Sequence, residues 1–240
     1  MTMKILISGL ALIITITGSA QNISYPEGYE AQENLKALSD IEHSESIRTF
    51  DNRYEGVKGT PYVLDKFHPG EVYLKSKNRV TVQDMNYDCI ENEIVYIDPA
   101  TKVIRLMNRY QVDFFIIRNG DRIMTFVPLV LEEDAETIFA EMLYNLGSRV
   151  YKVYGKDWIK ANYEGGYSPD RRYDEFRDTY DFYFMKKGEY ILHKARKSKK
   201  QLIAAFPDHE KEISSFIKSH KLNLKEDESL VSLLKYYDSL

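Results

Sequence analysis

The chain has 240 residues, a formal net charge of −4 at pH 7 and a single cysteine. This acidic balance argues against nucleic acid as a general partner, and one cysteine cannot form an internal disulfide. The length is sufficient for one sizeable domain with its own hydrophobic core and a small appendage.

Residues 1–20 have the layout of a secretory signal peptide. Lys4 precedes an apolar run over residues 5–16, and small residues follow up to Ala20. We therefore predict cleavage after Ala20 and export to the periplasm or the extracellular space. A membrane anchor is the alternative, but a run of about a dozen apolar residues is short where about 20 are needed. No second long apolar run follows, so we expect no transmembrane segment after signal removal.

Residues 21–48 are polar and mixed in charge, with one weak helical pattern over 31–38. We interpret this stretch as an N-terminal arm or a short helix laid on the domain.

Residues 50–62, FDNRYEGVKGTPY, resemble an opening motif in secreted, uncharacterised proteins of Bacteroidota type. The likeness extends loosely through residues 161–168 and the Phe206-Pro207 pair. The resemblance implies export and a domain of unknown function, and it offers no catalytic residues.

Residues 71–130 consist of short apolar-polar runs broken by turn residues, which is typical of an antiparallel meander. The alternation changes phase between Val82 and Met85, so we expect a bulge near Gln83 and Asp84. Residues 98–101, Asp-Pro-Ala-Thr, fit a type I turn between two strands.

Asn119-Gly120 lies between two apolar runs and predicts a hairpin with a type I′ turn, because both residues tolerate positive φ. A further hairpin is predicted over residues 138–145 and 149–159. The fold class we predict is mainly β (α+β): an antiparallel meander over residues 49–197, curled or barrel-like.

Residues 162–178 are predicted to form a long irregular loop, which in a compact domain is usually functional or disordered. Its aromatic and arginine side chains are of the types enriched where proteins bind partners. The candidate ligand-binding or partner-binding residues are Tyr167, Arg171, Arg172 and Tyr173. The alternative is a packed lid held by its own Asp-Arg pairs and tyrosines.

Residues 181–185 and 189–195 predict a last hairpin across Lys187-Gly188, where a basic run begins. It comprises Lys186, Lys187, Lys194, Arg196, Lys197, Lys199 and Lys200, opposed only by Glu189. Such a run attracts an anionic lipid surface or a polyanionic glycan, or is simply solvated. From Ser198 the apolar period changes to that of helices, so residues 198–240 predict three short helices packed on the sheet.

No catalytic, metal or cofactor motif is present. The five histidines are dispersed, and His209-Glu210 lacks the second histidine of a metalloprotease helix, since residue 213 is isoleucine. Cys89 lies on the apolar phase of its strand, which favours a buried, inert thiol.

Two acidic stretches imitate calcium sites. Asp84, Asn86 and Asp88 have the spacing of a calcium loop, but cysteine and valine stand where glycine and glutamate are required. We therefore expect these three side chains to share the wet face of a strand. The cluster at 132–134 lacks evident further ligands, and a solvated loop is expected there.

Three functions remain open. The first is an exported, non-enzymatic protein that binds a ligand or an envelope partner through loops of the β domain. The second is a structural or assembly component of the cell envelope. The third is a hydrolase whose carboxylates converge only in the fold, which sequence spacing cannot reveal.

Overall fold

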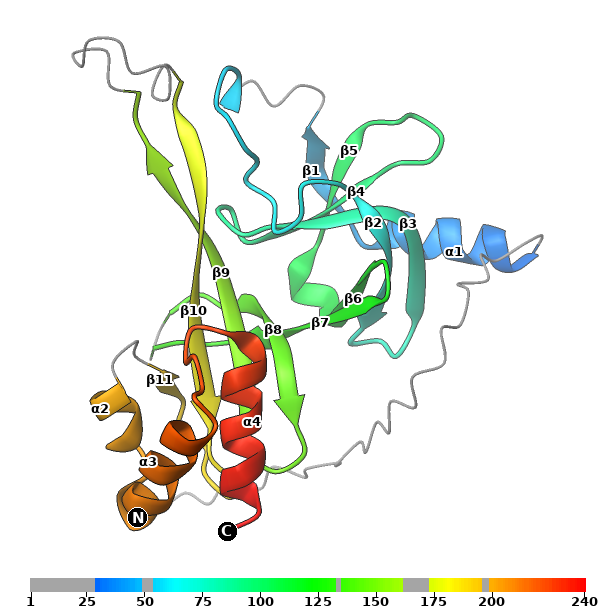
Figure 1. Ribbon diagram of the computed structural model, residues 1–240. Coiled ribbons are helices and arrows are strands. Elements are labelled where there is room, and N and C mark those ends of the chain that lie inside the picture. Colours follow the sequence, from blue (N-terminus) through cyan, green and yellow to red (C-terminus); the bar gives the residue numbers. More distant parts are fainter. Residues whose placement is uncertain (1–28, 49–53, 133–134, 162–172, 196–198) are drawn as a thin grey trace, which may run out of the picture.

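The computed structural model describes residues 29–48, 54–132, 135–161, 173–195 and 199–240 (Figure 1). The predicted signal peptide lies outside these residues. Eleven antiparallel strands form one sheet in the order β1-β5-β4-β3-β2-β6-β7-β8-β9-β10-β11. The strands are β1 Glu42–Arg48, β2 His68–Leu74, β3 Arg79–Asp88, β4 Glu93–Ile97, β5 Ile104–Met107, β6 Val112–Asn119, β7 Arg122–Leu129, β8 Ile138–Asn145, β9 Arg149–Ile159, β10 Glu175–Met185 and β11 His193–Ala195.

The helices are α1 Tyr29–Asp40, α2 Lys199–Ile203, α3 Glu210–Ser219 and α4 Asp227–Asp238, with single 3-10 turns η2 Arg109–Gln111 and η4 Pro207–His209. The predicted fold class is thereby confirmed: a mainly antiparallel sheet that curls without closing, with short helices at the C-terminal end. Among the described residues, none of the helices combines the length and apolarity needed to cross a bilayer.

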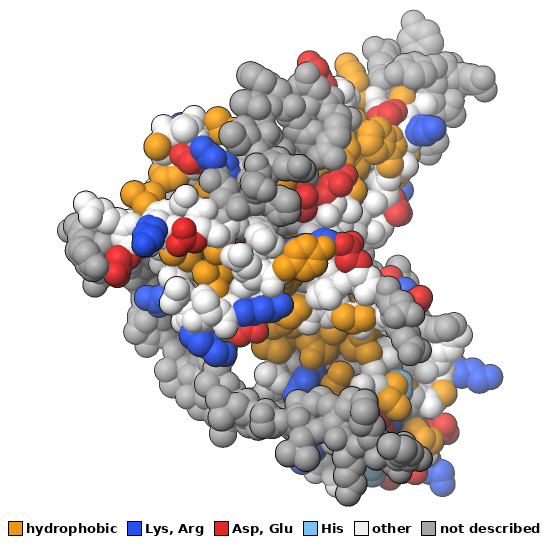
Figure 2. Space-filling model, turned by 180° about the vertical axis from the view of Figure 1, so that it is seen from behind, with side chains coloured by type: hydrophobic (Ala, Val, Ile, Leu, Met, Phe, Trp, Pro, Cys, Tyr) orange, Lys and Arg blue, Asp and Glu red, His pale blue; other side chains and the backbone are white. Residues whose placement is uncertain are grey.

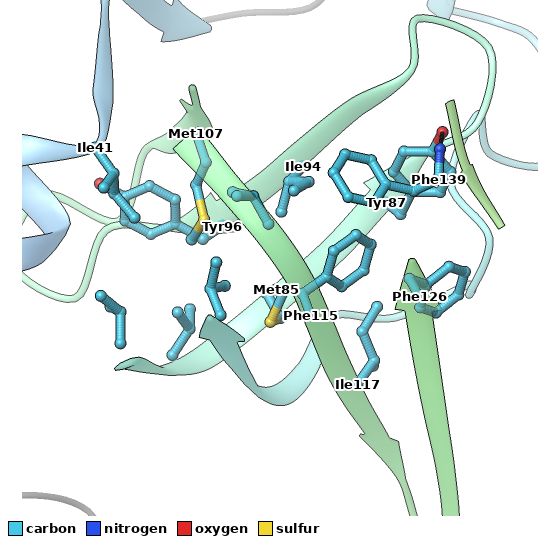
Figure 3. Close-up of a cluster of buried hydrophobic side chains, with 14 of the residues drawn as sticks. Ile41, Met85, Tyr87, Ile94, Tyr96, Met107, Phe115, Ile117, Phe126 and Phe139 are labelled. Atoms are coloured by element: carbon cyan, nitrogen blue, oxygen red, sulfur yellow. Dashed lines mark hydrogen bonds between the residues drawn. The ribbon is translucent and has the colours of Figure 1, made fainter. Parts of the chain in front are cut away.

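The first hydrophobic core fills the curl of β2–β7 and is closed at one side by α1 (Figure 3). Its centre is aromatic: the rings of Phe115 and Phe126 stack at 4.8 Å, and Tyr87 and Phe139 pack against them. The buried hydroxyl of Tyr87 donates to Asn92 Oδ1 at 2.7 Å and accepts from the Phe139 N–H at 3.2 Å. A polar atom can occupy this apolar centre because both of its hydrogen bonds are made.

The predicted turns of the meander are present, with one difference. The register between β2 and β3 shifts between His68 and Gly70, which places the extra residue of β3 at 83–84, as predicted. In the β6–β7 hairpin, however, Asn119 pairs with Arg122, so the two loop residues are Gly120 and Asp121. Only Gly120 has positive φ, +60°. This is the pattern of a type II′ turn with glycine first, so the predicted type I′ turn is wrong.

Two strand segments were not predicted. Residues 42–48 pair with β5 as edge strand β1, although their polar composition suggested only an arm or helix. Strand β10 begins at Glu175, inside the predicted loop of residues 162–178. Pairing with β9 along its whole length outweighs the polar composition of residues 175–178, because strand formation depends on cross-strand partners as much as on propensity.

Strands β9 and β10 extend beyond the rest of the sheet. They pair from Arg149 opposite Met185 to Ile159 opposite Glu175. Strand β8 accompanies β9 only as far as Lys152, and β11 accompanies β10 only at residues 182–184. The outer part, residues 153–159 with 175–181, is called the ribbon below and lies at the upper left of Figure 1.

The second core lies between the C-terminal helices and the inner parts of β8–β10. The helical segment contributes apolar residues at helical spacing: Leu202, Phe206, Ile213, Ile217, Leu230, Leu233 and Leu234. The strands contribute Tyr144, Val150, Phe182 and Phe184. Through this core the C-terminal helices pack on the sheet. Helix α4 is also held at its C-terminal end, where Asp238 accepts hydrogen bonds from the N–H and Oγ of Ser148 and from the hydroxyl of Tyr144.

Candidate functional site

The ribbon ends in an aromatic platform formed by Trp158, Phe176 and Tyr54. Trp158 and Phe176 are cross-strand partners, so their side chains lie on the same face of the ribbon. Their rings meet edge to face at 5.2 Å, and Tyr54 contacts both, at 5.9 Å from Trp158 and 5.0 Å from Phe176. Phe176 is buried, whereas Trp158 is 45% exposed. Figure 2, with the ribbon at the upper right, shows hydrophobic side chains on this surface.

Asp174 fixes the exposed indole in place. Its Oδ2 accepts a hydrogen bond from Trp158 Nε1 at 2.9 Å, and its Oδ1 accepts one from the Ala161 N–H at 2.8 Å. These two donors, first the Ala161 amide and then the indole, hold the pKa of Asp174 below its usual value. Asp174 therefore remains ionised at neutral pH, and Trp158 is oriented by a charge-assisted hydrogen bond.

Lys58 and Gly59, inside the motif of residues 50–62, support the ribbon from one side. Lys58 pairs with β10 in parallel: its N–H donates to Asp174 O at 2.8 Å, and its carbonyl accepts from the Phe176 N–H at 2.9 Å. Gly59 has φ of +92°, and a Cβ there would lie 3.1 Å from the Phe176 carbonyl oxygen. Two-stranded ribbons are marginally stable alone, so these contacts keep the platform ordered.

Of the four predicted site residues, the structure describes Tyr173, which directly precedes Asp174 in the chain and is 67% exposed. Tyr167, Arg171 and Arg172 lie outside the described residues, in the segment that connects β9 to β10 in the sequence. All four remain predictions.

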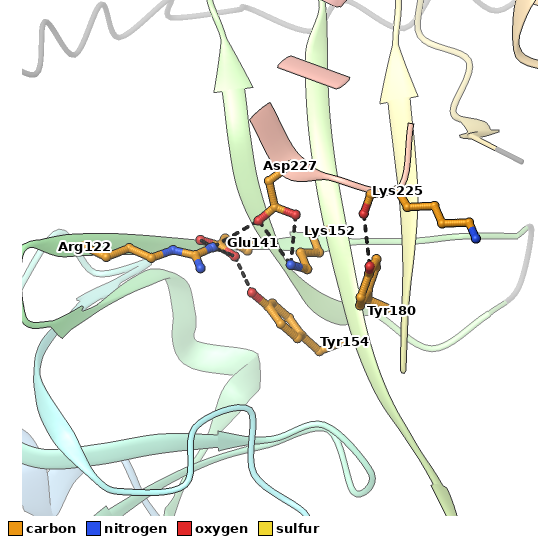
Figure 4. A network of polar contacts seen from close by, with 7 residues as sticks. All are labelled: Arg122, Glu141, Lys152, Tyr154, Tyr180, Lys225 and Asp227. Carbon is orange, nitrogen blue, oxygen red and sulfur yellow. Dashed lines mark hydrogen bonds and ion pairs between the residues drawn. The ribbon is translucent and has the colours of Figure 1, made fainter. Parts of the chain in front are cut away.

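A charged cluster links strands β7, β8 and β9 to the start of α4 (Figure 4). It consists of Arg122, Glu141, Lys152, Tyr154 and Asp227 and is called the charged seam below. Arg122 Nη2 donates to both carboxylate oxygens of Glu141 at 2.8 Å, and the Tyr154 hydroxyl donates to Glu141 Oε2 at 2.5 Å. Lys152 Nζ donates to the Asp227 carboxylate at 2.9 and 3.1 Å.

The charged seam joins α4 to the sheet. Asp227 is the first residue of α4. Arg122 Nη2 lies 3.4 Å from Asp227 Oδ2 and also donates to Glu141 of β8. One guanidinium therefore links the helix to the strand. Glu141 is only 2% exposed, and its charge is matched by Arg122. Burial, and then the neighbouring Glu141, raise the pKa of Tyr154 well above its ordinary value, so it is a permanent donor. These contacts assign the seam a structural role, because each carboxylate is already engaged.

A pocket of about 740 Å³ lies between α1 and the β2–β3 hairpin. Its walls carry charges of both signs and no aromatic side chain; the lining residues are Glu33, Asn34, Lys36, Ala37, Asp40, Ile41, Leu74, Ser76, Asn78, Arg79, Thr81 and Gln111. Asn34 holds the two walls together, since its amide exchanges two hydrogen bonds with the Thr81 backbone, at 2.9 and 2.8 Å.

Two carboxylates line the pocket, those of Glu33 and Asp40. They are seven residues apart on α1, which separates their Cα atoms by about 10 Å along the helix axis at 1.5 Å per residue.

Asn86 and Asp88, which belong to the sequence that resembles the start of a calcium loop, have structural roles. Asn86 and Asp88 are fully buried, so the prediction that they share a wet strand face is wrong. Asn86 Nδ2 donates to the carbonyls of Leu64 and Lys66 at 2.7 and 3.0 Å, and Asp88 Oδ1 accepts from two N–H groups of the following turn. The Asn86 amide therefore holds the loop at 54–67, and the Asp88 carboxylate holds the turn after β3. This loop folds over β3 and buries the face expected to be wet.

Cys89 follows β3 and is half-buried. Its thiol donates to the Pro61 carbonyl at 3.3 Å, and burial raises its pKa to about 12. The thiol is protonated at neutral pH, in agreement with the predicted inert role. Within the described part of the chain, no group of histidine, cysteine and acidic residues is arranged to hold a metal ion. The acidic cluster at 132–134 falls partly outside the described residues.

Glu141 and Trp158 carried sequence signals that pointed to their roles. Glu141 is the lone charge in the apolar run IFAEML, and such a carboxylate is buried only when it is paired. Trp158 is the single tryptophan of the chain and lies four residues before the start of the predicted loop at 162–178. Neither signal reveals its partners, because Arg122, Asp174 and Tyr54 are brought in by tertiary pairing.

Comparison of the chain with protein-family models, with curated proteins and with solved structures found no match.

Proposed function

We propose that this chain is an exported, non-enzymatic protein that binds an envelope partner through the end of its ribbon. The platform of Trp158, Phe176 and Tyr54 is the contact surface, together with the exposed Tyr173, which precedes Asp174 in the chain. Tyr167, Arg171 and Arg172, which fall outside the described residues, are assigned to it by their residue types. Export rests on the signal-like leader and on the resemblance of residues 50–62 to secreted proteins.

The observation that supports this proposal most directly is that the Trp158 indole is exposed to solvent and at the same time held in one orientation. Trp158 is 45% exposed, yet Asp174 hydrogen-bonds its Nε1 and two rings support its face and edge. A pre-oriented aromatic side chain loses little rotamer entropy when a partner covers it. Tryptophan, tyrosine and arginine also dominate the residues that contribute most to protein–protein affinity.

Affinity capture from an envelope extract tests the proposal. The bait is the chain from Gln21 onward, compared with Trp158→Ala and with the control Tyr110→Ala. Tyr110 is 64% exposed on η2, outside the ribbon. We expect Trp158→Ala to weaken capture of the partner by about 30-fold, as for a contact worth about 2 kcal/mol, and Tyr110→Ala to leave it unchanged.

The connecting segment is tested separately with a variant in which Arg171, Arg172 and Tyr173 are alanine. A weaker complex is expected. If this variant and the original chain capture identical partners in identical amounts, the segment does not belong to the site. If Trp158→Ala also behaves like the original chain, the proposed function is refuted.

Export is tested by expressing the whole chain in a Gram-negative host and sequencing the N-terminus of the accumulated protein. We expect a periplasmic or secreted product that starts at Gln21. A cytoplasmic product that retains Met1 contradicts the export part of the proposal.

A further inference from the structure

Three segments meet at the end of the sheet opposite the platform: the β8–β9 turn at 145–149, the β10–β11 connection at 186–192, and the end of α4 at 235–240. The Lys187 N–H donates to Ser148 Oγ at 3.2 Å, which joins the first two segments. Asp238 accepts from Ser148 N at 2.8 Å and from Ser148 Oγ at 2.6 Å, which joins the third. This surface is called the basal end below.

Large apolar side chains project from the tips of the basal end. Tyr190 is 90% exposed, Leu146 is 80% exposed and Ile191 is 63% exposed. The same helices and strands turn their other apolar residues into the second core. Tyr190 and Ile191 are adjacent in the β10–β11 connection, and Leu146 is at the tip of the neighbouring hairpin. These are isolated protrusions, whereas a protein partner needs a contiguous, complementary surface.

Positive charge surrounds these tips. The three segments contain the cations Arg149, Lys186, Lys187 and Lys235 and the side-chain carboxylates Glu189 and Asp238. Glu189 is paired with Lys186 at 2.7 Å and His193 at 3.0 Å.

Asp238 is occupied by its hydrogen bonds from Tyr144 and Ser148. The basal end is therefore locally basic on a chain whose net charge is −4. Arg149, Lys187 and Lys235 are exposed at this end.

We infer that the basal end docks on an anionic lipid bilayer. Tyr190, Ile191 and Leu146 insert among the headgroups, and Arg149, Lys187 and Lys235 lie over anionic lipid phosphates. Tyrosine favours the membrane interface, where its ring is apolar and its hydroxyl remains hydrated. Interfacial binding combines apolar area with attraction to anionic lipids, and the basal end offers both.

This docking would place the two ends of the molecule at different distances from the bilayer. Strand β9 has 11 residues between them, which is about 35 Å at 3.3 Å per residue. The platform at Trp158 would then face away from the membrane. The inference does not depend on the identity of the platform's partner, and vesicle binding is measured without it.

Co-sedimentation with vesicles tests the inference, using the chain from Gln21 onward. Vesicles of phosphatidylcholine with about one third phosphatidylglycerol are compared with pure phosphatidylcholine. We expect binding to the anionic vesicles only, and its loss at an ionic strength of about 1 M, where charges are screened within about 3 Å. Binding to neither kind of vesicle, or equally to both, overturns the inference.

The apolar contribution is tested with the double variant Tyr190→Ser, Ile191→Ser and with the control Leu35→Ser. Leu35 is 53% exposed on α1. The double variant should lower the partition coefficient by about tenfold or more, and the control should not change it. Thermal unfolding of each variant checks that both remain folded.

Three results contradict bilayer docking. The first is unchanged vesicle binding by the folded double variant. The second is binding to soluble dextran sulfate, a polyanion without lipid, that is as strong as binding to anionic vesicles and is unchanged in the double variant. The third is a concentration-dependent dimer without vesicle binding that the double variant abolishes, because the basal end would then join two copies of the chain.

Discussion

Replacing Leu234 by alanine tests the packing of α4 on the sheet. Leu234 is completely buried in the second core, among Leu230, Leu233 and the rings contributed by β10. Large-to-small changes of this kind cost about 2–5 kcal/mol, with the higher values where the surroundings cannot collapse into the cavity.

The structure favours the upper part of that range. Asp227 ties the first turn of α4 to Lys152 at 2.9 Å, and Asp238 ties its last turn to Ser148 at 2.8 Å. With both ends fixed to strands, the helix cannot shift inward to fill the space left by the deleted side chain. We therefore expect a loss of about 3–5 kcal/mol in the free energy of unfolding and a fall of about 10 °C in the melting temperature.

Equilibrium urea unfolding measures this loss, and Leu146→Ala is the matched control. Leu146 undergoes the same chemical change but is 80% exposed, so we expect its effect to stay within about 0.5 kcal/mol. If the two variants unfold at the same urea concentration as each other, α4 does not form the second core as described.

The remaining two predictions concern backbone conformation and pH. Gly120→Val should destabilise the chain by about 1 kcal/mol or more, because the residue has φ of +60°; an unchanged unfolding midpoint would contradict the turn. Burial raises the pKa of Cys89 from 9.0 to about 12, so its thiolate fraction at pH 8 should be about a thousandfold lower in the folded protein than in the unfolded chain. Reaction with a disulfide reagent should be correspondingly slow until urea unfolds the protein, and equal rates in both states would refute the burial. Because the folded pKa is the higher one, the stabilisation from this group is complete below about pH 9 and decreases as pH rises toward about 12.

The local features of the sheet follow from its sequence. Alternation predicted the meander, and the phase change after Val82 predicted the bulge at 83–84. Helical spacing predicted the three C-terminal helices and their apolar faces. These features depend on neighbours in the chain, which is why pattern is sufficient to find them.

The failures concern contacts between residues distant in sequence. Asn86 and Asp88 alternate like exposed strand residues, but both are buried. The loop at 54–67 takes up the hydrogen bonds of Asn86, and the turn after β3 takes up those of Asp88. Strand β10 begins at Glu175, before the predicted end of the loop, because Phe176 pairs with Trp158 on β9. At Gly120, the expected position was off by one residue, since pairing of Asn119 with Arg122 fixes which two residues form the loop.

The platform could not be predicted from the sequence. Composition pointed to the connecting segment and to Tyr173, which is exposed and precedes Asp174 in the chain. The platform itself requires Tyr54 from another part of the chain and the hydrogen bond from Trp158 to Asp174. The spacing of these residues in the sequence predicts neither contact.

The most direct test of the account uses Trp158 as its own reporter. Because it is the single tryptophan, emission excited at wavelengths that tyrosine does not absorb comes from the platform alone. Titration with the captured partner, prepared without tryptophan or with its emission subtracted, should change the emission and saturate at the stoichiometry of the complex. A complex that forms with unchanged Trp158 emission would show that the partner binds elsewhere.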